Sequence, residues 1–191
     1  MPNFDLKTHS CLTLICLVIY LNPLDIKADE INYSSYSYGG VGLLEMPSAR
    51  FSDDGEFKFG ISDQEPYRRL YGSVQFFPWL EAVLKYTEGT YKPYQVGLDQ
   101  TWKDKGLDLK FRLAKESAYL PALAIGIHDL GGTGAFSGEY LVASKNVNNF
   151  DFTLGLGWGK FRGKGGITNP FTILSDSFEK RGKKSSIGGT L

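Results

Sequence analysis

The residues best suited to catalysis are His128, Asp129 and Ser137, which lie close together in the chain. They offer the base, the carboxylate and the hydroxyl of a Ser-His-Asp hydrolase. His128 and Asp129 are neighbours on a predicted strand, however, so their side chains should point to opposite faces of the sheet and could not form a catalytic pair. We therefore predict no catalytic residue and expect His128 to lie in the interior or at a rim. The protein is predicted not to be an enzyme.

A cofactor or metal site is equally poorly supported by the residue types. The glycine-rich stretch 130–138 (LGGTGAFSG) invites comparison with a phosphate-binding loop. No lysine follows it in register and no helix begins there, so a hairpin loop is the better interpretation. Both cysteines, Cys11 and Cys16, lie in an amino-terminal apolar run, and only His128 would remain after its removal. We predict no metal and no cofactor.

Charged residues that alternate with apolar ones give the sharper functional candidates. A lysine or arginine facing lipid near the middle of a bilayer costs about 2–4 kcal/mol, so on a membrane barrel these residues must face the lumen. Two interpretations stay open: an ion-pair network that holds the interior together, or a pathway for a carbohydrate or polyanion. The lumen-facing candidates are Glu81, Lys85, Asp108, Lys110 and Arg112.

The elements that would position these charges are strands. Apolar residues at 107, 109, 111 and 113 alternate with Asp108, Lys110, Arg112 and Ala114, and residues 150–158 alternate equally cleanly. This period of two is typical of strands with one apolar face. With weaker instances, we count about seven strands, over 57–61, 70–76, 80–86, 107–113, 123–127, 140–144 and 150–158. The predicted fold is all-β, an antiparallel up-and-down meander.

Alternation alone does not separate a membrane barrel from a soluble lipocalin or sandwich. Glycines at 155, 157 and 159 occupy the polar face of one strand, which suggests that a narrow lumen crowds that face. Aromatic residues near strand ends match the girdle of an outer-membrane barrel. The girdle candidates are Phe76, Trp79, Tyr86, Tyr140 and Trp158. We therefore predict an outer-membrane β-barrel type.

The chain divides into four parts. Residues 1–28 are predicted to be a signal peptide, with Lys7 before the apolar run 11–21 and Ala28 at its end. Residues 29–54 form a segment rich in Tyr, Ser and Gly, either a plug or linker or a surface on which sugars stack. Residues 55–160 carry the barrel strands. Because seven is an odd strand number, 161–191 are interpreted as a loop and the start of a further strand in a longer protein.

Several stretches resemble the YjbH family of exopolysaccharide-biosynthesis proteins, to which the capsule protein GfcD is related. They are 38–50 (YGGVGLLEMPSAR), 77–81 (FPWLE), 103–113 (KDKGLDLKFRL), 119–145 (YLPALAIGIHDLGGTGAFSGEYLVASK) and 149–159 (NFDFTLGLGWG). The resemblance covers about residues 36 to 180. It implies an outer-membrane β-barrel of Gram-negative bacteria that works with partners to make or export an extracellular polysaccharide. Family members are labelled lipoproteins; neither Cys11 nor Cys16 lies in a convincing lipid-attachment motif. The family supplies no catalytic residues to transfer.

The expected function is thus non-enzymatic participation in exopolysaccharide biosynthesis or export, by an exported protein of the outer membrane. Expected partners are outer-membrane lipid, exopolysaccharide and other assembly proteins. Nucleic acid is not expected, because 21 basic residues balance 21 acidic ones. Two alternatives remain: a soluble periplasmic β-module that binds polysaccharide or a partner protein, and a small outer-membrane barrel enzyme that acts on lipid or polysaccharide.

Overall fold

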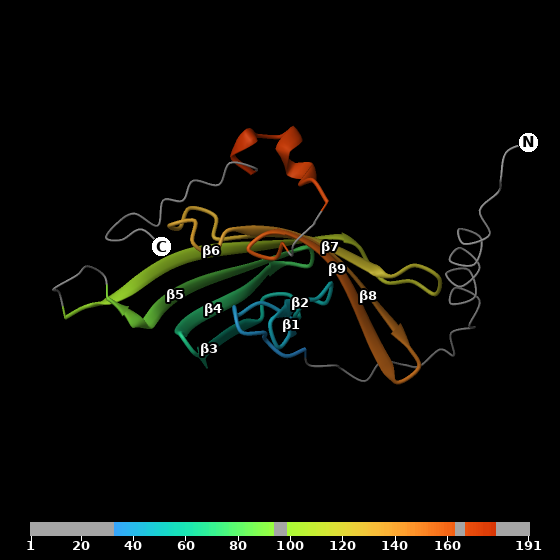
Figure 1. The fold of residues 1–191 in the computed structure, drawn as a ribbon. Coiled ribbons are helices and arrows are strands. Elements are labelled where there is room, and N and C mark those ends of the chain that lie inside the picture. Colours follow the sequence, from blue (N-terminus) through green and yellow to red (C-terminus); the bar gives the residue numbers. More distant parts are fainter. Residues whose placement is uncertain (1–32, 94–98, 163–166, 179–191) are drawn as a thin grey trace, which may run out of the picture.

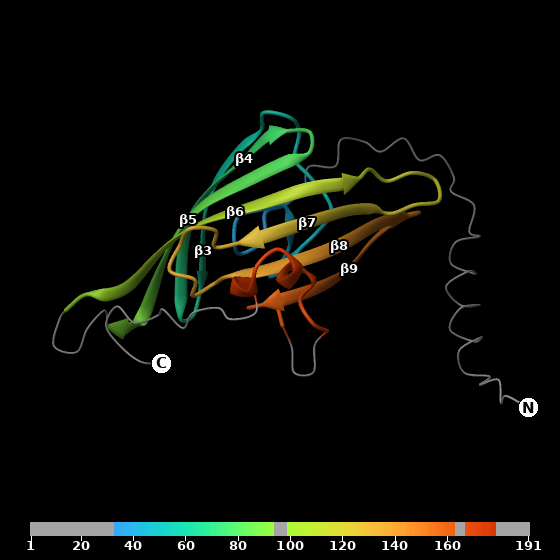
Figure 2. The same cartoon turned by 90° about the horizontal axis from the view of Figure 1, so that it is seen from above.

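The computed structural model describes residues 33–93, 99–162 and 167–178. The predicted signal peptide and the predicted start of a further strand lie outside these residues. Seven strands form one antiparallel sheet in which each strand pairs with the next along the chain. They are β3 (Phe57–Gln64), β4 (Tyr67–Phe77), β5 (Leu80–Pro93), β6 (Thr101–Ala114), β7 (Ala122–His128), β8 (Gly138–Val147) and β9 (Phe150–Gly159). The sheet curls into a half-barrel, which confirms the predicted all-β meander (Figures 1 and 2).

Several strands extend beyond the segments predicted from alternation. β5 and β6 have 14 residues each. β4 begins at Tyr67, which pairs with Gln64 of β3, so only Glu65 and Pro66 separate these two strands. Polar residues such as Arg68 at the strand ends break the apolar alternation, although the backbone pairing continues through them. Arg69 therefore belongs to the sheet.

The amino-terminal segment, residues 33–52, lies on the concave side of the half-barrel (Figure 1). It contains a two-stranded hairpin of β1 (Gly42–Leu43) and β2 (Met46–Pro47). Its apolar residues pack against the concave face of the sheet in a core of Ala49, Phe51, Ala122, Ala124, Tyr140 and Val142, with Phe161 beside them. The segment thus fills part of the space that the sheet encloses.

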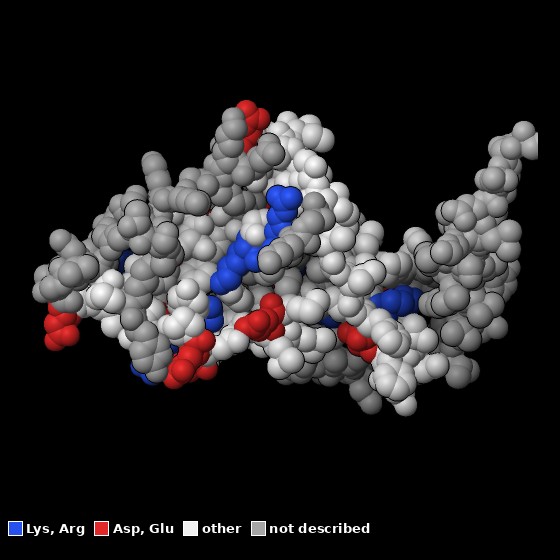
Figure 3. All heavy atoms as spheres, viewed as in Figure 1, with Lys and Arg blue, Asp and Glu red and all other residues white. Residues whose placement is uncertain are grey.

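The two faces of the sheet differ in chemistry. The convex face carries apolar residues that remain exposed: Phe57, Phe59, Ile61, Leu70, Phe76, Leu84, Leu113, Phe150, Phe152, Leu154 and Leu156. The concave face buries polar and charged side chains, among them Arg69, Ser73, Gln75, Glu81, Lys85, Thr87, Asp104, Asp108, Lys110 and His128. In the view of Figure 3, most of the described surface is uncharged, with acidic and basic residues in a few separate places. Apolar side chains exposed on one face and charged side chains buried on the other are the reverse of the usual distribution in a soluble protein.

Two short 3-10 helices, η1 (Pro170–Ile173) and η2 (Asp176–Phe178), lie over the convex side near β9 (Figure 1). The amide of Asn169 donates a 2.9 Å hydrogen bond to the buried Glu139 carboxylate. The Trp158 indole N–H donates a 3.0 Å hydrogen bond to the carbonyl of Ile167. These contacts cover one end of β8 and β9. Among the described residues, no helix is long and apolar enough to cross a membrane.

Candidate functional site on the concave face

Four of the five lumen-facing candidates form two buried ion pairs between β5 and β6. Lys85 Nζ lies 2.5 Å from Asp108 Oδ1, and the two side chains are 1% and 6% exposed. Lys110 Nζ lies 3.0 Å from Glu81 Oε1, with exposures of 3% and 5%. Glu81 and Lys110 are direct partners in the strand register, which places their side chains next to each other. These four interior charges therefore compensate one another.

The fifth candidate, Arg112, faces the same side of the sheet. Its guanidinium lies 4.3 Å from the centroid of the Phe51 ring, in the amino-terminal segment. Lys110 approaches the same ring, at 4.6 Å. The structure therefore brings all five candidates together on one face, and contacts with the amino-terminal segment extend the ion-pair network.

The Glu81–Lys110 pair also holds the backbone of the amino-terminal segment. Val41 N–H donates a 3.1 Å hydrogen bond to Glu81 Oε2. Lys110 Nζ donates to the carbonyls of Val41, at 3.1 Å, and Arg50, at 2.8 Å. A buried pair with its remaining donors and acceptors satisfied avoids most of the desolvation penalty. The described part of the predicted 29–54 segment is thus packed into the half-barrel.

His128 is 1% exposed and contacts the same segment. Its Nε2 shares a 2.6 Å hydrogen bond with the Tyr36 hydroxyl, and its Nδ1 lies 3.7 Å from Asp108 Oδ2. Burial raises the pKa of the Tyr36 hydroxyl well above its ordinary value, so this hydroxyl stays protonated. Neither contact provides the serine nucleophile of a hydrolase.

The prediction that Asp129 points away from the His128 face is wrong. Asp129 has a φ of 59°, which ends the alternation of β7 and turns its carboxylate back toward the concave side. Its Oδ2 accepts a 3.1 Å hydrogen bond from Phe136 N–H, and its own N–H donates a 2.8 Å bond to Asp108 Oδ1. Asp129 therefore organises the 129–137 loop. No group of three or more His, Cys, Asp or Glu suited to a metal occurs among the described residues.

The five girdle candidates do not share one environment. Phe76 and Trp79 are 56% and 50% exposed, and Trp79 stacks on Phe77 with ring centroids 5.4 Å apart. Tyr86 is half-buried on the convex face. Trp158 is 6% exposed because the segment containing Phe171 covers it. The convex face thus presents some of the predicted rings and covers another.

Tyr140 contradicts its assignment to the girdle. It faces the concave side, is 4% exposed, and lies edge-on to His128 and Phe161. Glycine makes this placement possible: a Cβ atom at Gly126, its partner on β7, would lie 2.1 Å from Tyr140 Cζ. The strand at 140–144 was predicted, but its faces were assigned the wrong way round: Tyr140 and Val142 lie in the concave core, and Leu141 and Ala143 take the convex positions.

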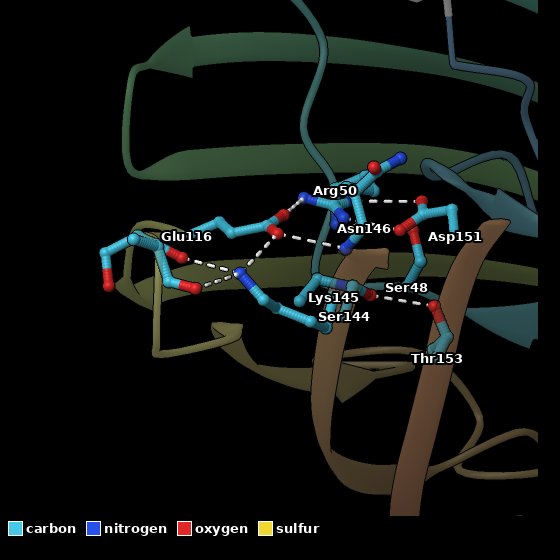
Figure 4. A network of polar contacts seen from close by, with 11 residues as sticks. Ser48, Arg50, Glu116, Ser144, Lys145, Asn146, Asp151 and Thr153 are labelled. Atoms are coloured by element: carbon cyan, nitrogen blue, oxygen red, sulfur yellow. Dashed lines mark hydrogen bonds and ion pairs between the residues drawn. The ribbon is translucent and has the colours of Figure 1, made fainter. Parts of the chain in front are cut away.

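A second polar network, which includes Arg50, Glu116 and Lys145, fixes the amino-terminal segment beside the link between β6 and β7 (Figure 4). Arg50 Nη1 donates a 2.6 Å hydrogen bond to Glu116, and its Nε donates a 3.0 Å bond to Asp151. Lys145 Nζ lies 3.0 Å from Glu116. Nearby, Ser144 Oγ accepts a 2.9 Å hydrogen bond from Ala49 N–H. The network joins the segment to the β6–β7 link, β8 and β9.

Replacing Arg50 by alanine should loosen this rim. We expect a loss of about 1–2 kcal/mol of stability, because two carboxylates lose a charged partner while remaining partly hydrated. Urea unfolding and the rate of proteolysis within residues 33–52 measure the effect. Arg68→Ala is the matched control, since the Arg68–Asp63 pair is exposed. Equal changes in the two variants would contradict the anchoring role of Arg50.

Acidification is a second readout of the same network. Burial raises the pKa of Glu116, but hydrogen bonds from Lys145, Arg50 and Asn146 N–H outweigh burial and hold this pKa below its usual range. A carboxyl of this kind stabilises the fold above its unfolded pKa, and the contribution is lost as the pH falls through the folded value. Proteolysis of the segment should therefore accelerate below about pH 4. Glu116→Gln should remove that part of the acid dependence.

The fold and the site define an all-β half-barrel with an apolar convex face, a charged concave face and an amino-terminal segment packed inside. The chain belongs to the YjbH family, whose model, described as exopolysaccharide biosynthesis protein YbjH, matches residues 34–191. It is 46% identical over 165 residues to the "Uncharacterized lipoprotein YjbH" of Escherichia coli (strain K12). That match covers 84% of this chain and 24% of the relative, so the chain spans about a quarter of the relative's length. No solved structure matches the chain.

Sequence reasoning missed three charged residues of the concave face: Arg69, Asp104 and Lys160. Arg69 lay just outside the predicted strand 70–76, but the same alternation continued by one residue would have placed it inward, opposite Leu70. Asp104 was likewise outside 107–113. Lys160 follows the last residue of β9, and no sequence signal indicates that its ammonium turns onto aromatic rings.

Proposed function

We propose that this chain is part of an outer-membrane β-barrel that acts without catalysis in exopolysaccharide biosynthesis, at the export of the polymer. The observation that carries the proposal is the distribution of apolar and charged side chains between the two faces. As whole residues, Phe59 and Leu154 on the convex face are 68% and 79% exposed, whereas Lys85 and Lys110 on the concave face are 5% and 2% exposed.

Water would be an unfavourable neighbour for this convex face. Soluble monomers rarely leave apolar patches that extend over several strands uncovered, and such patches mark contact with a membrane or a partner. Lipid tails would remove the apolar side chains from water at about 25 cal/mol per Å². The concave face suits a polar environment instead, because it carries charged side chains that form ion pairs and hydrogen bonds. A barrel in a bilayer provides both environments.

The biological role follows from family membership rather than from geometry. The family is described by exopolysaccharide biosynthesis, and the relative from Escherichia coli is named a lipoprotein, which fits a protein of the cell envelope. A non-enzymatic role agrees with the polar contacts of His128, which among the described residues are to Tyr36 and Asp108. Outer-membrane lipid, the exopolysaccharide and other assembly proteins are the proposed partners.

Extraction of membranes tests the location. In a Gram-negative host, the native protein should sediment with the outer membrane after washing with sodium carbonate and enter solution only with detergent. A lipid anchor would give the same result, so the experiment is repeated with the Cys11→Ala/Cys16→Ala variant, whose membrane retention must rest on the strands. Release of this variant by carbonate would overturn the barrel and favour a periplasmic module.

A further inference from the structure

Among the described residues, Arg69 is a buried cation without an anionic partner. It lies on the concave face of β4 and is 3% exposed. Within the described part of the chain, its Nε and Nη1 atoms have no hydrogen-bond partner. Leaving buried donors of a charged group unsatisfied is costly. A ligand that accepts hydrogen bonds from the Arg69 guanidinium would remove this cost.

Aromatic rings surround the Arg69 guanidinium. Its Cζ atom lies 4.4 Å from the centroid of Tyr38, 5.2 Å from Tyr67 and 5.5 Å from Phe136. Cation–π contacts offset part of the desolvation cost, but they leave the in-plane N–H donors available. The rings thus hold the guanidinium in place without consuming the donors that would bind an oxyanion.

A second cation approaches the same three rings. Lys160 Nζ lies 3.8 Å from the centroid of Phe136, 4.9 Å from Tyr38 and 5.6 Å from Tyr67. Lys160 is exposed as a residue, yet its ammonium rests against the buried Phe136 ring. Two like charges at one aromatic cluster repel each other, and an anion between them would relieve that repulsion. We call Tyr38, Tyr67, Arg69, Phe136 and Lys160 the cation cluster.

Orphaned hydroxyl and carboxylate oxygens lie beside the cation cluster. Arg69 pairs with Thr87 in the strand register, and Thr87 pairs with Asp104, so the three residues form one row across β4, β5 and β6. Thr87 Oγ1 and Asp104 Oδ2 are buried and lack hydrogen-bond partners among the described residues. Asp104 would repel a bare anion but could accept a hydrogen bond from a hydroxyl group. The row therefore matches a ligand that carries both an acid group and hydroxyl groups.

An aromatic platform completes the site. Trp102 and Tyr67 are half-buried, and their ring centroids are 6.3 Å apart. Trp102 also lies 5.9 Å from Phe136, so the platform is continuous with the cation cluster. Tryptophan and tyrosine present a flat apolar surface with a polar edge, which suits the apolar face of a sugar ring.

We propose that the cation cluster binds an acidic sugar residue, with the acid group between Arg69 and Lys160, hydroxyl groups on Thr87 and Asp104, and the sugar ring against Tyr67 and Trp102. This rests on the proposed function, because it names the chemical class of the polymer that the half-barrel would contact. A neutral sugar would leave both cations unpaired. A small inorganic anion would leave the hydroxyl-binding row and the platform unused.

Binding to the native protein in detergent tests the proposal, with tryptophan fluorescence or calorimetry as the readout. Oligosaccharides of glucuronic acid should bind, whereas the matched oligosaccharides of glucose and inorganic phosphate should bind at least about tenfold more weakly. Arg69→Gln should weaken glucuronate binding by about tenfold or more. Lys105→Gln is the matched control, because it removes a cation from an exposed residue of β6 and should leave binding unchanged.

A second variant covers the case in which Arg69→Gln does not fold. Lys160→Gln changes an exposed residue and should weaken glucuronate binding several-fold. Burial, together with Arg69 and Lys85, lowers the pKa of Lys160 to about 7, although Glu45 and Asp108 oppose the shift. Glucuronate binding should therefore weaken as the pH rises from about 6 to about 9, and Lys160→Gln should lose this dependence.

Three outcomes would overturn the acidic-sugar site: equal binding of glucose and glucuronate oligosaccharides, phosphate that binds as tightly as glucuronate, or unchanged binding in both Arg69→Gln and Lys160→Gln. Failure of the proposed function gives a different result. Release of the protein by carbonate, or unchanged polymer secretion after its gene is deleted, would contradict the proposed function. Neither result would prevent glucuronate from binding at the cation cluster.

Discussion

Replacing Glu81 by alanine is expected to destabilise the protein by about 3–5 kcal/mol, because the Lys110 ammonium would stay buried without its carboxylate. The Lys110 side chain is 3% exposed and lies 3.0 Å from Glu81. The same change removes the acceptor of the Val41 N–H. Unfolding in urea, followed by intrinsic fluorescence in detergent micelles, measures the loss.

Two controls separate the ion pair from other effects of the substitution. Glu81→Leu combined with Lys110→Met replaces both charges by apolar groups and should recover most of the stability, because neither charge is left alone. Asp63→Ala breaks an ion pair with Arg68 in which both side chains are about half exposed, and it should have a much smaller effect. Equal losses in Glu81→Ala and Asp63→Ala would show that the buried pair does not support the interior.

The period-two pattern predicted the architecture because strands such as β6 place apolar side chains on the convex face and polar side chains on the concave face. Residues 107–113 and 150–158 lie on β6 and β9, with the alternation that the sequence indicates. Pairing of each strand with its successor is the pairing of an up-and-down meander, as predicted. The pattern was weakest at strand ends, where Arg68 and Glu88 continue the backbone pairing without apolar alternation.

Alternation predicts which residues share a face but not always which face is the interior. Tyr140 shows the limit: an aromatic residue near a strand end suits a girdle as well as a core. Glycine at 126 and at 157, on the strands either side of β8, leaves room for bulky rings on the concave face. Such complementarity between strands depends on register, which a single strand does not reveal.

Contacts of the amino-terminal segment were beyond prediction for a different reason. Tyr36 meets His128 across 92 residues, and Ala49 meets Ser144 across 95. No local period encodes such distant contacts, because they depend on how the sheet curls around the segment. The five charged candidates were found from alternation, whereas the unpaired state of Arg69 emerged only when its neighbours were placed in three dimensions.

Replacing Leu154 by arginine should severely impair assembly of the protein into the outer membrane. Leu154 is 79% exposed and lies in the middle of β9, opposite Ala143 of β8. At the midplane of a bilayer the change should cost about 2–4 kcal/mol, because the guanidinium would have to leave water or thin the membrane. Folding into lipid vesicles, measured by protease protection and urea titration, gives the size of the effect.

Gln100→Arg is the matched control, because it adds the same charge at an exposed residue of the β5–β6 link. It should assemble like the native protein. A soluble module would behave in the opposite way to a barrel: Leu154→Arg would replace an apolar residue that contacts water, so solubility would improve and the fold would be unaffected. Normal membrane assembly of Leu154→Arg would thus contradict the proposal that the convex face contacts lipid. Loss of assembly confined to Leu154→Arg would place that face in the bilayer and leave the buried charges of the concave face to line the interior.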